Sequence, residues 1–329
     1  MSFGSLRSTL VGIFVLFFVS YGGAAAQGPG AAYPATAEVS DQKAGSVLLY
    51  PYYTSGSFSG NAQNTRINIT QTADVPQPTR IYLIRSNGGV IARHICLQAK
   101  QTDSYLMSSL DPGNSGYILV VAVDADGCPV GANTLIGDAS VKLTTGHSSS
   151  LTAYAYAALF SGTLSGCGPT STTANVNLDG TAYNRSPRTV AIDKVPSRSD
   201  GNDTLLILSR VGGNLVTGST GSIGDVSGSL FDQSGTSFPF SFNVAQPLLV
   251  RSISNLFPVT SPSFETVLPA GTVGWMKMAG DADIGLLGAV INFNANARAQ
   301  ANAFSGGHGL RALTVTPAAS FVVPVAPGC

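Results

Sequence analysis

The sequence predicts an all-β protein made of two tandem antiparallel β-sandwich domains of the immunoglobulin-like type, following a cleaved signal peptide. Three observations predict this fold. Short apolar or alternating segments recur at intervals typical of sandwich strands, turn residues separate them, and no stretch keeps the period of a long helix. Glycine occurs 38 times and charged residues make up only 10% of the chain, so turn-forming and hydroxyl-bearing residues fill the polar positions.

The first residues have the three parts of a secretory signal peptide. Arg7 supplies a positive start, an apolar stretch covers 10–19, and small residues end at Ala26. We expect cleavage after Ala26, because the apolar stretch is shorter than the roughly 20 residues that span a bilayer. The mature chain has no transmembrane segment by this criterion. It is therefore expected outside the cell, on its surface or in the periplasm.

Individual strands can be placed in order along the mature chain. The alternation in 65–70 predicts a half-buried strand with Ile67 and Ile69 on one face. The segments 79–85 and 90–97 predict a hairpin, since the glycine-rich turn between them accepts positive φ. The remaining expected strands are 46–50, 116–123, 140–144, 151–160, 189–192, 204–209, 227–231, 238–244, 248–253, 271–278, 285–293 and 310–316.

These segments divide the chain into regions. A stretch rich in glycine, serine, threonine and asparagine separates two patterned halves and predicts a linker. A single larger sandwich would give the same local pattern, and the sequence leaves that alternative open. The predicted regions are a signal peptide (1–26), a flexible N-terminal segment (27–40), a first sandwich domain (41–162), a linker (163–186) and a second sandwich domain (187–329).

Four cysteines lie in the mature part, and an even number in an exported chain predicts disulfide bonds. Three connectivities exist for Cys96, Cys128, Cys167 and Cys329. We favour Cys96 with Cys128, because they flank neighbouring strands. This choice leaves Cys167 to join Cys329.

Close carboxylate pairs in glycine-flanked turns are the strongest metal signal. Asp124 with Asp126, and Asp281 with Asp283, are such pairs, and calcium prefers oxygen ligands in extracellular loops. Neither pair continues into the ligand spacing of an EF-hand loop. Aspartate also commonly stabilises such turns by hydrogen bonds, and this role explains the same residues without a metal. We therefore expect no cofactor, and a structural calcium ion is the one metal hypothesis.

No arrangement of residues predicts catalysis. His94, His147 and His308 are isolated, without the spacing of a metal-binding helix, and no nucleophile elbow occurs. We therefore identify no catalytic residue and expect no enzymatic activity. A hydrolase whose residues converge only in space is an alternative, because such sites are recognised by geometry.

Aromatic residues offer the best candidates for binding. Tyr50, Tyr52 and Tyr53 cluster at one strand end, and tyrosine faces stack on sugars and peptides. The same residues are ordinary core components of a sandwich. Trp275, the single tryptophan, lies in an apolar strand and is expected in the core.

The charges balance to zero, which excludes an electrostatic footprint for nucleic acid. The partner classes that suit a neutral, hydroxyl-rich surface are a neutral glycan or another surface protein.

Four segments, AGSVLLYPYY, NTRINIT, LDPGNSGYILVVAVDADGCP and GGHGLRALTVTPAASFVVPVAPGC, carry a resemblance. They resemble a family of exported bacterial β-rich proteins without assigned activity. The resemblance implies a bacterial envelope or extracellular setting and a terminal cysteine that belongs to the pattern. It transfers no catalytic residue.

Together these observations predict an exported, disulfide-bonded, non-enzymatic surface or envelope protein with a structural, adhesive or ligand-binding role. The first alternative is a carbohydrate-binding module that uses surface tyrosines. The second is the hydrolase named above.

Overall fold

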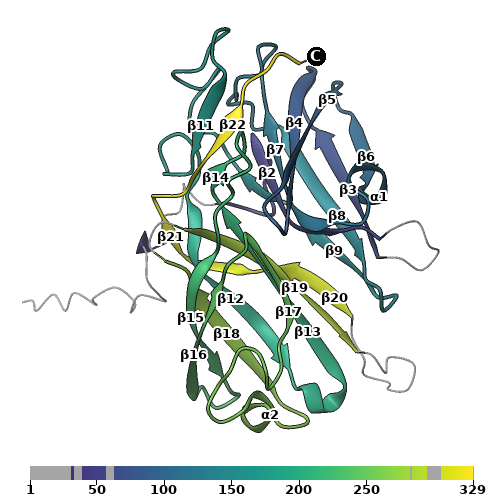
Figure 1. Ribbon diagram of the computed structural model, residues 1–329, viewed down its shortest axis with the longest axis vertical. Coiled ribbons are helices and arrows are strands. Elements are labelled where there is room, and N and C mark those ends of the chain that lie inside the picture. The colour runs from purple at the N-terminus through teal and green to yellow at the C-terminus, as the bar shows by residue number, and fades with distance from the viewer. Residues whose placement is uncertain (1–30, 33–38, 57–62, 282–283, 295–304, 329) are drawn as a thin grey trace, which may run out of the picture.

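The computed structural model describes residues 31–32, 39–56, 63–281, 284–294 and 305–328 (Figure 1). The predicted signal peptide lies outside these residues. Within them the protein is all-β, and its few helical turns are short. No described helix has the length and apolarity needed to cross a membrane. The helical turns are α1 (Met107–Leu110), η1 (Arg198–Asp200) and α2 (Phe264–Val267).

The strands of the described residues form five small sheets, so the prediction of two tandem immunoglobulin-like sandwich domains is wrong. The smallest sheet shows why, because it combines three distant parts of the chain in the order β11-β22-β14. Its first strand lies in the predicted linker and its other strands in the predicted second domain. Its strands are β11 (Thr173–Asn177), β14 (Gly213–Asn214) and β22 (Ser320–Pro324).

The five-stranded sheet has the order β10-β2-β7-β4-β5 and is antiparallel throughout. Every residue of β2 is buried, which explains its continuous apolar run. The predicted hairpin is confirmed as β4 and β5, with Gly88 at φ 90° in the turn. Its strands are β2 (Val47–Thr54), β4 (Gln77–Arg85), β5 (Val90–Leu97), β7 (Ser115–Ala122) and β10 (Tyr154–Tyr156).

A four-stranded sheet from the same part of the chain has the order β6-β3-β8-β9. Ile67 and Ile69 of β3 are fully buried, as the alternation predicts. The helical turn α1 follows β6 directly and buries Met107. The strands are β3 (Asn64–Gln71), β6 (Thr102–Leu106), β8 (Leu135–Lys142) and β9 (Ser148–Thr152).

The six-stranded sheet has the order β1-β21-β12-β18-β15-β16. Its edge strand β1 comes from the start of the described chain and pairs with β21 near its end. The strands are β1 (Ala31–Ala32), β12 (Ser186–Pro196), β15 (Gly224–Phe231), β16 (Ser237–Val244), β18 (Val273–Ala279) and β21 (Arg311–Thr316).

The last sheet has the order β17-β13-β19-β20. Its two central strands, β13 and β19, pair along ten registered positions from Asn202 to Val211. Most residues of β19 are buried, in agreement with the apolar run predicted there. The strands are β13 (Asn202–Val211), β17 (Leu248–Ser252), β19 (Gly285–Asn294) and β20 (Gly306–Gly309).

Of the two hydrophobic clusters among the described residues, one spans both halves of the chain. Buried residues of β19, such as Leu287 and Ile291, belong to the same cluster as the strands around β2. The hydroxyl of Tyr154 lies 2.8 Å from the Gly288 carbonyl oxygen and 2.9 Å from that of Leu310. Burial of shared apolar surface therefore links sheets that the sequence pattern assigned to separate units.

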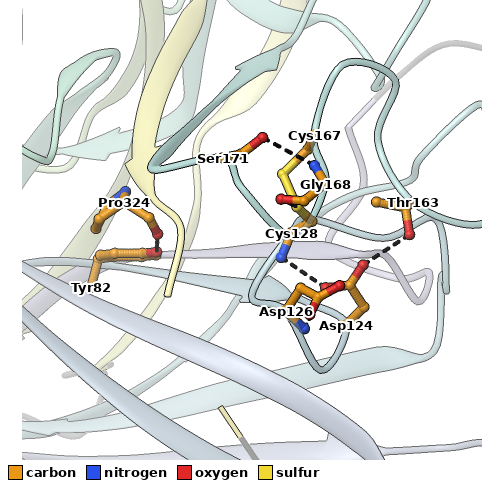
Figure 2. The surroundings of a disulfide bond; sticks show 9 residues. All are labelled: Tyr82, Asp124, Asp126, Cys128, Thr163, Cys167, Gly168, Ser171 and Pro324. Atoms are coloured by element: carbon orange, nitrogen blue, oxygen red, sulfur yellow. Dashed lines mark hydrogen bonds between the residues drawn. A yellow bond between two sulfur atoms is a disulfide. The ribbon is translucent and has the colours of Figure 1, made fainter. Parts of the chain in front are cut away.

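The disulfide bonds differ from the predicted connectivity. Cys128 is joined to Cys167, so both favoured pairs are wrong (Figure 2). Cys96 is also disulfide-bonded, and Cys329 lies outside the described residues. Closing a loop with a separation of 39 residues stabilises the fold by about 4 kcal/mol in the chain-entropy account.

Candidate functional site

The tyrosine cluster is part of the core and not a surface patch. Tyr50 and Tyr53 are fully buried, and Tyr52 is 5% exposed. The hydroxyl of Tyr50 donates to the Asn68 carbonyl oxygen at 2.7 Å, and burial raises its pKa. These side chains present no face to a ligand, so the interpretation as surface tyrosines that bind sugar is wrong.

Tyr53 instead belongs to a saturated polar network around Asp111. Its hydroxyl donates to Asp111 Oδ2 at 2.7 Å, while Arg85 Nη2 donates to Oδ1 at 2.6 Å and Asn114 Nδ2 to Oδ1 at 2.9 Å. Burial by itself would raise the pKa of Asp111, but the hydrogen bonds from Arg85 and Tyr53 and the charge of Arg85 hold it below its usual value. The network stabilises the fold, and the buried Asp111 carboxylate is fully engaged within it.

The first predicted calcium pair is a closed turn (Figure 2). Asp124 Oδ1 accepts hydrogen bonds from the backbone N–H of Asp126 and of Cys128, at 3.0 and 2.9 Å. Its Oδ2 accepts from the Thr163 hydroxyl at 2.8 Å. This carboxylate stabilises the turn beside the disulfide, which is the ordinary role of aspartate in such turns.

Of the second pair, Asp283 lies outside the described residues, whereas Asp281 is described and precedes β19. Across the described ranges, no three histidine, cysteine, aspartate or glutamate side chains gather closely enough to hold a metal ion. The calcium hypothesis stays a prediction.

A cleft of about 710 Å³ opens where β12, β18 and β20 approach one another. One wall of the cleft contains a β-bulge: Ile192 pairs with Met276 and Val195 with Gly274, so Asp193 and Lys194 both lie opposite Trp275. A bulge of this kind turns two successive side chains toward the same face of the sheet. Asp193 and Lys194 are both exposed and line the cleft.

His308 also lines the cleft, and both its ring nitrogens face acceptor oxygens. Nε2 is 3.2 Å from Asp193 Oδ1, and Nδ1 is 2.9 Å from the Gly309 carbonyl oxygen. In a catalytic triad one nitrogen takes the carboxylate and the other faces the nucleophilic hydroxyl. Here Nε2 faces the Asp193 carboxylate, but Nδ1 faces the Gly309 carbonyl oxygen and not a hydroxyl, although Ser305 also lines the cleft.

The other acidic group of the cleft also has protein partners. The Asp200 carboxylate accepts hydrogen bonds from the Gly271 backbone N–H, the shorter at 2.9 Å. Asn292 Oδ1 accepts from the Thr204 hydroxyl at 2.7 Å. This wall therefore offers amide and backbone groups to a ligand, and its carboxylate is already engaged.

The remaining histidines are engaged elsewhere. Arg80 Nε donates to His94 Nε2 at 2.7 Å, and burial together with the charge of Arg80 lowers the pKa of His94. His147 Nδ1 lies 3.0 Å from the Thr145 hydroxyl on an exposed turn. No sequence spacing connects these residues with His308, and the structure does not bring them together in the cleft.

Trp275 is not the core residue that the sequence suggests. It alternates with the buried Met276, is half-exposed, and stacks on Phe231 with ring centroids 4.1 Å apart. Sequence reasoning also missed Asp193 and Lys194. No local signal marks them, since a bulge depends on the register of the partner strand.

Comparisons with known proteins add little to this geometry. No protein-family model matches the chain, and no curated protein matches it. A solved structure titled Thermotoga maritima 1070 has a TM-score of 0.27 and 11% identity, covering 34% of this chain and 92% of its own. The PBSX exported protein XepA has a TM-score of 0.19 and 10% identity, covering 74% and 85%. An α-L-rhamnosidase from Streptomyces avermitilis has a TM-score of 0.21 and 9% identity, covering 84% and 28%. These likenesses transfer neither fold nor activity.

Proposed function

We propose that the protein is an exported, non-enzymatic surface or envelope protein that binds an uncharged polar ligand, such as a neutral glycan, in the cleft at Asp193 and His308. The observation that carries the proposal is the engagement of the cleft's acidic and imidazole groups by protein partners. Groups held in this way offer shape and hydrogen bonds but no free base for catalysis.

Export rests on the N-terminal sequence and is supported by the disulfide between Cys128 and Cys167. Such bonds persist in oxidising compartments and are rare in the cytosol. The low charge of the chain supports a neutral partner, because charged ligands are usually met by complementary charge. A hydrolase would require a base aimed at a nucleophile, whereas the ring nitrogens of His308 face the Asp193 carboxylate and the Gly309 carbonyl oxygen, which favours binding over hydrolysis.

Thermal unfolding of the mature protein with a panel of neutral oligosaccharides tests the proposal. A ligand that binds only the native state raises the unfolding midpoint. We expect at least one glycan to raise the unfolding midpoint of the wild-type protein. The same glycan should raise the midpoint less in Asn292→Ala, a variant in the cleft, and by the wild-type amount in the matched control Asn243→Ala. Asn243 is an exposed asparagine outside the cleft. Hydrolysis of any panel substrate, or no shift with every glycan, would contradict the proposal.

A further inference from the structure

Arg210 is a half-buried cation near the end of β13, without a carboxylate partner among the residues that the structure describes. Its Nη1 donates to the Ser222 carbonyl oxygen at 2.6 Å, whereas its buried Nε has no hydrogen-bond partner. None of the ion pairs found among the described residues includes Arg210. Charges withdrawn from water are normally paired, so this guanidinium needs an explanation.

The nearby hydroxyl of Tyr117 does not supply the missing charge. It is buried without a hydrogen-bond partner, and burial raises the pKa of Tyr117 despite the opposing effect of Arg210. The phenol therefore stays neutral at physiological pH. No described acidic residue therefore compensates the positive charge of Arg210.

Arg210 lines an open cavity of about 470 Å³ between the ends of β13 and β22. No acidic residue is among those that line it. Nη2 makes no hydrogen bond to a described residue and, unlike Nε, is not among the buried unpartnered atoms, so solvent reaches it. The polar groups beside it come from Asn214, Ser219 and Ser320.

The backbone around Arg210 is shaped to leave this space. A Cβ atom at Gly221 would lie 2.8 Å from Arg210 Nη1, closer than side chains normally approach, whereas one at Gly212 would lie 3.4 Å from Nε, at ordinary contact distance. At Gly213, where φ is 95°, a Cβ would lie 2.4 Å from the Ser219 carbonyl oxygen. Glycine lets the chain approach both the guanidinium and the cavity wall closely.

We propose that this cavity binds the carboxylate group of an extracellular ligand, such as an acidic sugar. Arg210 Nη2 donates to the carboxylate, because guanidinium is the side chain best matched to that group. Asn214 supports this, since its Oδ1 already accepts from the backbone N–H of Val216 and of Thr217, which leaves its Nδ2 to donate. The hydroxyls of Ser219 and Ser320 supply further donors.

This site is separate from the cleft proposed for neutral ligands. Asn202 at the start of β13 lines the cleft, and Arg210 near its end lines the cavity. Eight residues of extended strand place them about 26 Å apart. The two proposals can therefore fail independently.

Calorimetric titration of the mature protein with D-galacturonate and with D-galactose tests the carboxylate site. We expect galacturonate to bind in the cavity at Arg210 and galactose not to bind there. Arg210→Gln should weaken galacturonate binding at least about tenfold, as expected for the loss of a charge-assisted hydrogen bond. Arg188→Gln is the matched control, because Arg188 is also half-buried with an unpartnered Nε but does not line the cavity. It should bind as the wild type does.

Acetate and phosphate serve as further probes. Binding of acetate together with galacturonate supports the proposal and shows that the carboxylate suffices. Binding of phosphate without either carboxylate overturns it, as does equal weakening in Arg188→Gln. Should Arg210→Gln fail to fold, Arg210→Lys keeps the charge but loses the planar guanidinium, and unchanged galacturonate affinity in that variant overturns the proposal. Asn292→Ala should leave galacturonate binding unchanged.

Discussion

Arg85 and Arg210 lie in similar places but have opposite surroundings. Arg85 is the last residue of β4 and Arg210 the next to last of β13, and both are half-buried. Arg85 meets a carboxylate that is completely buried, whereas Arg210 meets a carbonyl oxygen and a cavity. The difference separates a group that holds the fold from one that is left available to a ligand.

Removal of the buried carboxylate should have the largest effect on stability and tests the assigned role of Arg85 in holding the fold. Asp111→Ala leaves the guanidinium of Arg85, the hydroxyl of Tyr53 and the amide of Asn114 without their common acceptor. Breaking a buried pair from one side costs about 3–5 kcal/mol. Urea unfolding should show this loss. The exposed Asp225→Ala is the control, and a loss of similar size there would remove the distinction.

Removing a single donor to the same carboxylate should cost less. Tyr53→Phe deletes one hydrogen bond to a charged group, which is worth about 1.5–3 kcal/mol. Tyr105→Phe is the matched control, because its hydroxyl donates to Asp103 at 2.9 Å on a half-exposed strand. Chemical denaturation of both variants measures the difference. Equal losses in the free energy of unfolding would mean that burial does not strengthen the hydrogen bond from Tyr53 to Asp111.

The pH dependence of stability gives a third test of the network. Because the folded pKa of Asp111 lies below its unfolded value, its contribution is fully present above the unfolded pKa of about 3.9 and is lost as pH falls through the folded pKa. The advantage of wild type over Asp111→Asn should therefore shrink as the pH is lowered to about 2. If the stability advantage of the wild type grew on acidification, the direction assigned to the pKa shift of Asp111 would be wrong.

Local structure could be predicted from the sequence to a large extent. The alternation around Ile67 and Ile69 gives β3, and the turn at Gly88 gives the β4–β5 hairpin, because both depend on neighbouring residues only. The pairing of distant strands could not be predicted. β11 pairs with β22, and its polar sequence carries only Ala174 and Val176 as buried apolar side chains.

The candidate sites were harder to predict for the same reason. The sequence left both a core role and a binding role open for the tyrosines, because the acceptors of the Tyr50 and Tyr53 hydroxyls, Asn68 and Asp111, come from other elements. The bulge at Asp193 depends on the register with β18. Nothing near Arg210 in the sequence shows that it lacks a carboxylate, since an absent partner can be recognised only in space.

The smallest expected effect is the loss of stability on replacing Arg210. Arg210→Gln removes one hydrogen bond to a carbonyl oxygen, which destabilises the fold. It also removes a charge that is partly withdrawn from water without a partner carboxylate, which stabilises the fold. The two contributions oppose each other. The free energy of unfolding should therefore change by less than about 1 kcal/mol.

Urea unfolding of Arg85→Gln and Arg210→Gln, measured side by side without ligand, tests the distinction most directly. We predict a loss of about 3–5 kcal/mol for Arg85→Gln, which strands the buried Asp111, and less than about 1 kcal/mol for Arg210→Gln. Equal losses in the two variants would contradict the account, because Arg210 would then be as much a part of the fold as Arg85.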